Sequence, residues 1–263
     1  MASPHTTPPG EPFLTVVIPA YNEERRIVPT LHQVTQYLVK QPFSWDVVVA
    51  NDGSTDGTEN LVHEFSRGQP RVRSLPLPHR GKGGAVRSGM LSTSAQYRFL
   101  CDADLSMPIE QLERFLPPQI NDCDVVIGSR EAPGARRIGE PWRRHLQGRL
   151  FNAMTMALAV PGIRDTQCGF KCFSGHAADL LFPLQGIPGF GFDVEVLFLA
   201  RRMGLRLVEV PIDWYYRHES KVRPLRDGLA MSRDLLLVRW NSWRGKYGRR
   251  KHASAAPQSQ EKQ

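Results

Sequence analysis

Two carboxylates stand one residue apart at the point where a strand-like run ends. Asp102 and Asp104 directly follow the run 97–101, with Ala103 between them. Carboxylates at this spacing can converge on a hard divalent cation, Mg²⁺ or Mn²⁺. Such a cation bridges phosphates and offsets the charge that builds on a departing diphosphate. The alternative is a pair of turn or capping aspartates, but the position at a strand end favours the metal site.

Polar side chains also follow two other strand-like runs. Asp52 comes after the run 46–50, where its carboxylate can accept hydrogen bonds from a nucleotide base or ribose. Tyr21 and Glu23 follow the run 14–18; the ring can stack on a base, and the carboxylate can bind the base or ribose. The alternatives are an ordinary Asp-Gly turn and a helix start with acidic first-turn residues. On these residues alone both interpretations stay open.

A glycine-rich segment, residues 81–84, precedes a helix-like stretch and contains Lys82. Backbone amides at a helix start, together with this lysine, can bind phosphate. The segment does not match the dinucleotide fingerprint GxGxxG, because residue 86 is valine, and it lacks the spacing of a P-loop. It therefore indicates phosphate contact and no particular cofactor.

Alternating strand-like and helix-like segments determine where these side chains meet. We expect strands at 14–18, 46–50, 72–77, 97–101, 125–127 and 205–210. We expect helices at 23–40, 58–66, 81–94, 109–116, 143–160, 192–203 and 225–247, with 164–173 as a loop or short strand. This alternation predicts an α/β fold with a mainly parallel central sheet flanked by helices. Ligands of such sheets bind at the carboxyl ends of the strands, and the side chains described above fall there.

The positive charge of the chain is concentrated in two segments. Its 263 residues hold 34 Lys+Arg and 26 Asp+Glu, a net charge of +8. Residues 226–251 hold eight basic and two acidic residues, and residues 130–149 hold six and two, so the rest of the chain carries −2. Such segments fit nucleic acid, an anionic membrane surface or phosphate-bearing substrates. We expect no nucleic-acid partner, because zinc-finger, RNA-binding and helix-turn-helix signatures are missing from the sequence.

The ends of the chain and its cysteines indicate the compartment. We expect residues 1–12 to be a disordered leader without the apolar core of a signal peptide, and 252–263 a disordered tail. Residues 226–251 read as a basic amphipathic helix with tryptophans, suited to a membrane interface; a helix docked on the body is the alternative. The four cysteines lack zinc or thioredoxin spacing, and no apolar run is long enough to span a bilayer. We therefore expect a cytoplasmic protein, peripheral on the membrane.

Several motifs are spread over most of the chain. They are VVIPAYNEE (16–24), NDGSTDGT (51–58), RGKGGAVRSGM (80–90), DADLSMP (102–108), GSR (128–130), RDTQCGFKCF (164–173), FDVEVLFLA (192–200) and ESK (219–221). Taken together they resemble glycosyltransferase family 2, and within it the dolichyl-phosphate glucosyl- and mannosyltransferases. RGKGGAVR and DTQCGFK are similar to the glucosyl branch, and the mannosyl branch differs at both places.

The resemblance implies a GT-A (Rossmann-like) nucleotide-sugar-binding fold over residues 13–225. It implies metal-dependent transfer of a hexose, glucose from UDP-glucose, to a polyprenyl (dolichyl-type) phosphate, with inversion to a β-linked product. Mannosyl transfer from GDP-mannose and transfer to a hydroxyl acceptor are the alternatives. A phosphate acceptor is already anionic near neutral pH and needs no strong base. A hydroxyl acceptor needs one, for which Asp193 is the candidate; otherwise Asp193 and Glu195 simply favour a helix dipole.

The resemblance also assigns the site residue by residue. The nucleoside contacts would come from Pro19, Tyr21, Glu23, Ala50 and Asp52. The donor diphosphate and metal would be held by Asp102, Ala103 and Asp104, with Lys82 beside them and Arg217 and Lys221 closing from a loop. The acceptor phosphate would be received by Arg130 with Arg143 or Arg144. Ser106 lies where the mannosyl branch has a third metal ligand, usually Gln; serine is a weaker ligand, so we expect water to complete the shell.

Overall fold

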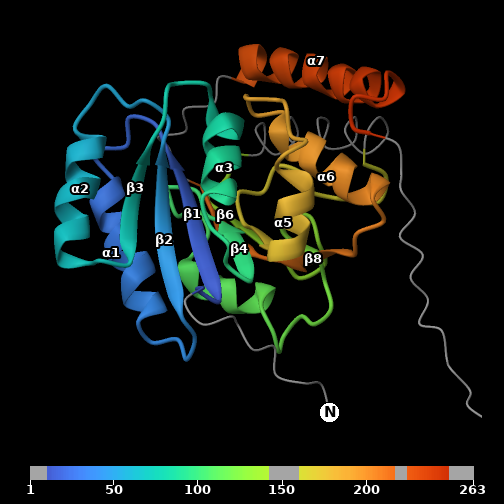
Figure 1. The fold of residues 1–263 in the computed structure, drawn as a ribbon. Coiled ribbons are helices and arrows are strands. Elements are labelled where there is room, and N and C mark those ends of the chain that lie inside the picture. Colours follow the sequence, from blue (N-terminus) through green and yellow to red (C-terminus); the bar gives the residue numbers. More distant parts are fainter. Residues whose placement is uncertain (1–10, 142–159, 217–223, 249–263) are drawn as a thin grey trace, which may run out of the picture.

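A seven-stranded sheet forms the centre of the computed structural model, which describes residues 11–141, 160–216 and 224–248 (Figure 1). Its strands lie in the order β3-β2-β1-β4-β7-β5-β8. They are β1 (Leu14–Ala20), β2 (Trp45–Asn51), β3 (Val72–Pro76), β4 (Tyr97–Leu100), β5 (Val125–Ser129), β7 (Lys171–Ser174) and β8 (Leu207–Pro211). Neighbouring strands are parallel except at β7, which runs antiparallel to β4 and β5. The expected α/β fold with a mainly parallel sheet is confirmed.

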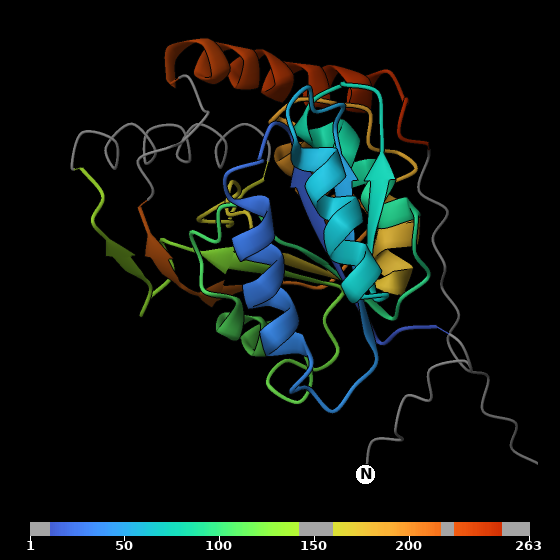
Figure 2. The same cartoon turned by 90° about the vertical axis from the view of Figure 1, so that its left-hand side faces the viewer.

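Helices cover both faces of this sheet (Figures 1 and 2). The helices are α1 (Ile27–Leu38), α2 (Thr58–Gly68), α3 (Lys82–Leu91), the 3₁₀ helix η1 (Ile109–Phe115), α5 (Gly175–Leu181), α6 (Phe192–Arg202) and α7 (Pro224–Trp243). Because side chains alternate across a strand, Val16 and Ile18 pack with α1, α2 and η1, whereas Val17 packs with α3, α5 and α6. β1 is therefore buried on both faces, which explains its continuous apolar run.

The register of the sheet brings the predicted site residues to one edge. Pro19 lies opposite Ala50, and Ala20 lies opposite Asn51 at the ends of β1 and β2. β4 ends at Leu100, which pairs with Val17 of β1. The segments that follow these strands, which start at residues 21, 52 and 101, therefore leave the same edge of the sheet.

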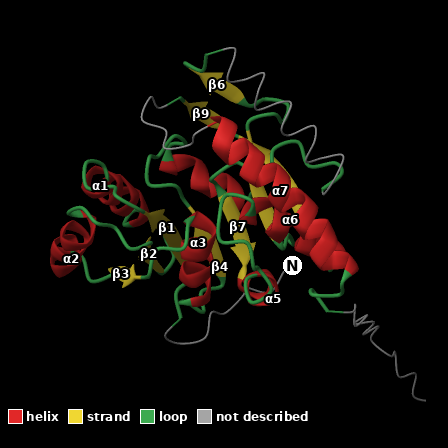
Figure 3. Cartoon of the chain, turned by 90° about the horizontal axis from the view of Figure 1, so that it is seen from above, coloured by secondary structure: helices red, strands yellow, loops and turns green. Residues whose placement is uncertain are grey.

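The long helix α7 lies over α6 and contacts it (Figures 1 and 3). Leu235 and Val238 are buried against the body, whereas the Trp243 side chain is 79% exposed. Beyond the helix Tyr247 is buried and donates its hydroxyl hydrogen to Oε1 of Glu195 at 2.7 Å. No helix in the described part of the chain is both long and apolar enough to cross a bilayer.

The structure corrects several sequence-based expectations. The first helix begins at Ile27 instead of residue 23, and 109–115 forms a 3₁₀ helix. The segment 164–173, expected as a loop or short strand, ends in β7, which proves to be an inner strand. The sequence also suggests that Leu235 to Val238 pack on the body and that 240–251 face lipid. However, Leu236 is exposed on the outer face of α7, and Tyr247, beyond the helix, is buried beside Glu195. The leader to residue 10, the helix at 143–160 and the tail lie outside the described residues, and the domain boundary at 225 stays a prediction.

A small second sheet stands beside the main one. β6 (Arg136–Ile138) pairs in parallel with β9 (Asp213–Tyr215). Arg136 binds Asp213 across it through Nε and Nη2 at 2.7 and 2.6 Å. This exposed pair provides a useful comparison for a buried pair described below.

Candidate active site

The carboxylate of Asp102 lies against the ammonium group of Lys82 just beyond β4. The distance from Lys82 Nζ to Asp102 Oδ1 is 2.6 Å, and both side chains are partly exposed, at 22% and 25%. Burial alone would lower the pKa of Lys82, but Asp102 foremost, then Asp193 and Asp104, hold that pKa above its usual range. The lysine is therefore a permanent cation within reach of three carboxylates.

A tight turn brings Asp104 back beside Asp102. Leu105, at its centre, has a positive φ of 44°, an uncommon conformation for a residue with a side chain. Its amide donates to the Asp102 carbonyl at 3.3 Å, and the Ser106 amide donates to Oδ1 of Asp104 at 2.9 Å. The turn thus fixes the Asp104 carboxylate.

Gly169 packs directly against the carboxylate of Asp102, and we call this backbone contact the floor beneath Asp102. A Cβ atom at position 169 would come closer than 3.0 Å to both Cγ and Oδ2 of Asp102, a separation that real Cβ atoms essentially never show. The absent side chain leaves the space that the carboxylate occupies. Two hard oxygen donors above this floor, already facing one cation, fit a divalent metal. Asp102 and Asp104 would hold it, with water completing the shell because no cluster of three His, Cys, Asp or Glu occurs among the described residues.

Asp193 and Lys171 form a second, fully buried ion pair. The distance from Lys171 Nζ to Asp193 Oδ1 is 2.6 Å, and the same nitrogen donates to the Cys168 carbonyl at 2.5 Å. Burial raises the pKa of Asp193, while Lys171 and then Lys82 act to lower it. Asp193 is thus engaged by a buried lysine, and its assignment as a catalytic base stays a prediction.

The Asp52 carboxylate binds the glycine-rich segment that opens α3. Its Oδ1 accepts from the Arg80 amide and its Oδ2 from the Gly81 amide, both at 2.8 Å. Gly81 has a φ of 106°, a backbone conformation that residues with a side chain rarely adopt. His79 lies 2.8 Å from Asp52 Oδ2 and stacks on the Tyr21 ring at a centroid distance of 4.2 Å. His79 was not predicted as a site residue, although its place two residues before Gly81 could have indicated it.

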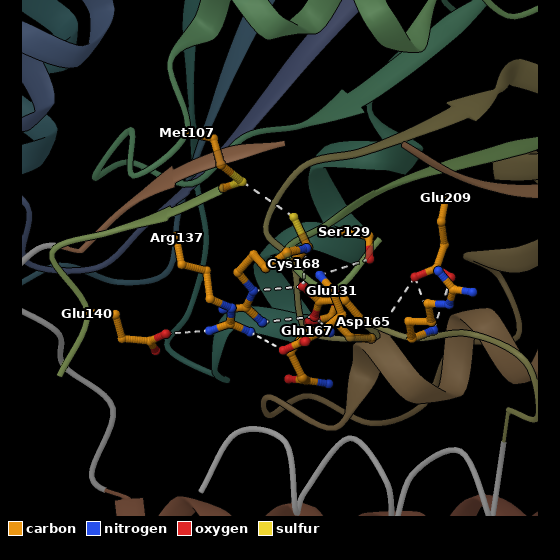
Figure 4. A network of polar contacts seen from close by, with 12 residues as sticks. Met107, Ser129, Glu131, Arg137, Glu140, Asp165, Gln167, Cys168 and Glu209 are labelled. Carbon is orange, nitrogen blue, oxygen red and sulfur yellow. Dashed lines mark hydrogen bonds and ion pairs between the residues drawn. The ribbon is translucent and has the colours of Figure 1, made fainter. Parts of the chain in front are cut away.

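Some of the other predicted residues lie in the described part of the chain, and some lie outside it. Pro19 and Ala50 lie opposite each other in the sheet, and Glu23 pairs with Arg26. Arg130 binds the buried Asp165 through its Nε and Nη2 (Figure 4), and its role toward the acceptor phosphate stays a prediction. Residues 143, 144, 217 and 221 lie outside the described residues, so Arg143, Arg144, Arg217 and Lys221 stay predictions.

Comparison with known proteins identifies the family. The model of "Glycosyl transferase family 2" matches residues 15–180. This chain belongs to glycosyl transferase family 2. A protein of Trichomonas vaginalis named dolichyl-phosphate beta-glucosyltransferase ALG5C is 35% identical over 242 residues, covering 88% of this chain and 72% of that protein. The human dolichyl-phosphate beta-glucosyltransferase is 33% identical over 241 residues, 86% of this chain and 74% of that protein.

Solved structures of another glucosyl-transferring enzyme share the fold. Glucosyl-3-phosphoglycerate synthase from Mycobacterium tuberculosis in complex with UDP superposes with a TM-score of 0.61 at 25% identity, covering 86% of this chain and 80% of that one. Its complex with Mn²⁺, UDP and glucosyl-3-phosphoglycerate gives a TM-score of 0.60 at 22% identity, covering 88% and 79%. The expected GT-A fold is confirmed.

Proposed function

We propose that this enzyme transfers glucose from UDP-glucose to a dolichyl-type polyprenyl phosphate, with inversion, giving a β-linked lipid-phosphate glucose. The main support is the similarity to relatives named dolichyl-phosphate beta-glucosyltransferase, which extends over most of this chain. The geometry supports it: two carboxylates and a lysine lie at the sheet edge, ready for a diphosphate and its metal. The UDP in the related solved structure supports the same donor nucleotide.

The reaction needs positioning and charge neutralisation more than a base. An anionic oxygen of the acceptor phosphate attacks the anomeric carbon while the bond from that carbon to the diphosphate oxygen breaks. Lys82 stabilises the charge that develops on the departing UDP. Since the phosphate oxygen carries no proton that must be removed, Asp193 can stay paired with Lys171 throughout.

A divalent cation, Mg²⁺ or Mn²⁺, supplies further neutralisation of the diphosphate when bound. Asp102 and Asp104 would hold it, with Ser106 contributing weakly and water filling the remaining positions. Pro19, Tyr21, Glu23, Ala50 and Asp52 would surround the nucleoside. Arg143 or Arg144 would receive the acceptor phosphate, and Arg217 and Lys221 would close over the donor.

The exposed face of α7 is suited to an anionic membrane surface on the cytoplasmic side. Leu236, Trp240 and Trp243 are exposed there and help line an open hollow of about 630 Å³. The two tryptophan rings lie 5.4 Å apart, and the Arg244 guanidinium lies 5.4 Å from the Trp240 ring. Apolar rings among arginines favour the lipid interface, because rings enter it and guanidinium groups meet the phosphates. A lipid acceptor would thereby reach the adjacent site.

The double variant Trp240→Ala/Trp243→Ala should bind vesicles of phosphatidylcholine and phosphatidylglycerol at least about tenfold more weakly than the parent. Removing both rings deletes the largest exposed apolar area of α7. Co-sedimentation measures the partition constant. Val39→Ala, which truncates an exposed apolar residue at the end of α1, is the control and should bind normally. Unchanged partitioning of the double variant would exclude α7 as the membrane contact.

The proposed function is tested directly by incubating the protein with UDP-glucose, Mg²⁺ or Mn²⁺ and a polyprenyl phosphate. The expected product is one lipid-linked β-glucose for each UDP released, detected by mass spectrometry and by its anomeric proton coupling. A parallel set with GDP-mannose, and one with hydroxyl acceptors, checks the two alternatives. Product only in those sets, or none at all, would refute the proposal.

A further inference from the structure

Arg130 and Asp165 form a buried bidentate ion pair between the end of β5 and the segment that leads into β7. Asp165 is fully buried; its Oδ2 accepts from N and Nε of Arg130 at 3.0 and 2.7 Å, and its Oδ1 accepts from Nη2 at 2.8 Å. Burial by itself would raise the pKa of Asp165, but the charge and hydrogen bonds of Arg130 outweigh it and lower that pKa to about 2. The pair is therefore charged at neutral pH.

The pair fixes the start of the segment 164–171. Oδ1 of Asp165 also accepts from the Gln167 amide at 3.2 Å. On the other side, Glu209 of β8 accepts from the amides of Arg164 and Asp165 at 3.0 and 2.9 Å (Figure 4). Glu209 of β8 thus holds two consecutive backbone amides of this loop, while Arg130, which directly follows β5, holds the Asp165 side chain.

The far end of the same segment touches the metal-site residues. Gly169 lies directly against the carboxylate of Asp102, and the Cys168 carbonyl accepts from Lys171, the partner of Asp193. The Cys168 thiol packs 3.4 Å from the Met107 sulfur, behind the Asp102–Asp104 turn. Asp165 and Gly169 are only four positions apart in the sequence. We therefore expect a displacement of Asp165 to move Gly169, and with it the surface against which the Asp102 carboxylate packs.

Asp165 occupies one edge of the Arg130 guanidinium group. This group carries five N–H donors, of which Nε and one hydrogen of Nη2 go to Asp165. The Trp214 ring lies 5.6 Å from the guanidinium carbon, which further fixes the group. The pair with Asp165 does not use Nη1, so the acceptor role expected of Arg130 stays a prediction beside its positioning role.

We propose that Arg130 and Asp165 are positioning residues for donor binding: they hold Gly169 beneath Asp102 and so set the affinity of the site for a metal-bound nucleoside diphosphate. Functional carboxylates must be held within about 0.5 Å of their working position. The Gly169 backbone lies so close to Asp102 that even a Cβ atom would collide with the carboxylate. The inference rests on the proposed function only in choosing UDP as the ligand.

The test measures UDP binding in the presence of Mn²⁺ by isothermal titration calorimetry, with no acceptor present. Arg130→Met should weaken UDP binding at least about tenfold, because it leaves a buried carboxylate without its cation and frees the loop. Arg130→Met/Asp165→Asn should bind better than Arg130→Met alone, since the unpaired charge is gone. Arg130→Lys keeps the charge but loses the fork, and it should lie between these two variants and the parent.

Arg136→Met is the matched control. It removes the same kind of bidentate Arg–Asp pair, with Asp213, from an exposed position on β6, and it should leave the UDP affinity unchanged. Thermal melting separates unfolding from a local effect. If Arg130→Met does not fold, the UDP affinity of Arg130→Lys is compared with that of the parent instead.

Steady-state kinetics give the second readout. In Arg130→Lys the KM for UDP-glucose should rise in step with the weaker UDP binding. An unchanged KM for UDP-glucose together with intact UDP affinity would overturn the proposal, whatever the KM for polyprenyl phosphate. Because UDP binding requires no acceptor, the calorimetric result stands even if the transferred sugar or its acceptor is a different one.

Discussion

Asp104→Ala is expected to lower kcat/KM for UDP-glucose by at least about 10³-fold while the protein remains folded. The loss corresponds to about 4 kcal/mol of transition-state stabilisation, the scale expected when a metal ligand at a departing diphosphate is removed. The fold should persist because Asp104 lies in a turn beyond β4, where, among the described residues, its side chain accepts the nearby Ser106 amide. Initial rates and thermal melting measure the two effects separately.

Glu64→Ala is the control for this prediction, since it removes one carboxylate from an exposed position on α2. Its rate should match that of the parent. Titration of Mn²⁺ in the presence of UDP gives an independent readout, in which Asp104→Ala should bind the metal more weakly. A variant with near-normal turnover would remove Asp104 from the metal site.

Gly169→Ala is expected to reduce kcat/KM by about 10²-fold or more, although it adds a single methyl group. That methyl would occupy the space of the Asp102 carboxylate, which must then move by about 1 Å; displacements of this size cost about 10²-fold in rate. Binding of UDP with Mn²⁺ should weaken in parallel. Initial rates and calorimetry test both statements.

Gly68→Ala provides the matched glycine control. A Cβ atom there has no other atom within 4 Å, and the residue ends α2 far along the chain from the carboxylates. Its activity should equal that of the parent. If Gly169→Ala also kept the kcat/KM of the parent, the contact between Gly169 and Asp102 would not matter for activity. The positioning role proposed for Arg130 and Asp165 would then be wrong as well.

The sequence predicted those parts of the fold that depend on neighbours in the chain. Apolar runs such as 46–50 and 97–101 marked the inner strands, because a buried parallel strand reads as a continuous apolar run. Asp52, Asp102 and Asp104 fell at strand ends, so a parallel sheet had to bring them to one edge. These conclusions needed only periodicity and the rule for ligand sites in such sheets.

The remainder depended on contacts between distant residues. Nothing local shows that β7 enters between β4 and β5, or that Gly169 touches Asp102, because a tight approach of two loops leaves no periodic pattern. Arg130 was assigned to a phosphate from the family resemblance, and its contact with Asp165, 35 positions later in the sequence, was not predicted. Fork geometry suits a carboxylate as well as a phosphate, so the sequence alone could not reveal this pair.

The place of β7 in the sheet imposes an order on folding during synthesis. β1, β2, β3 and β4 all lie within the first 100 residues and pair among themselves, so they can assemble as soon as that half leaves the ribosome. β4 gains its other neighbour only when Lys171–Ser174 arrives, and pairings of high sequence separation form late. A nascent chain that already displays Asp102 and Lys82 therefore still lacks Gly169. The emerging N-terminal half should leave UDP-glucose untouched until the second half has docked.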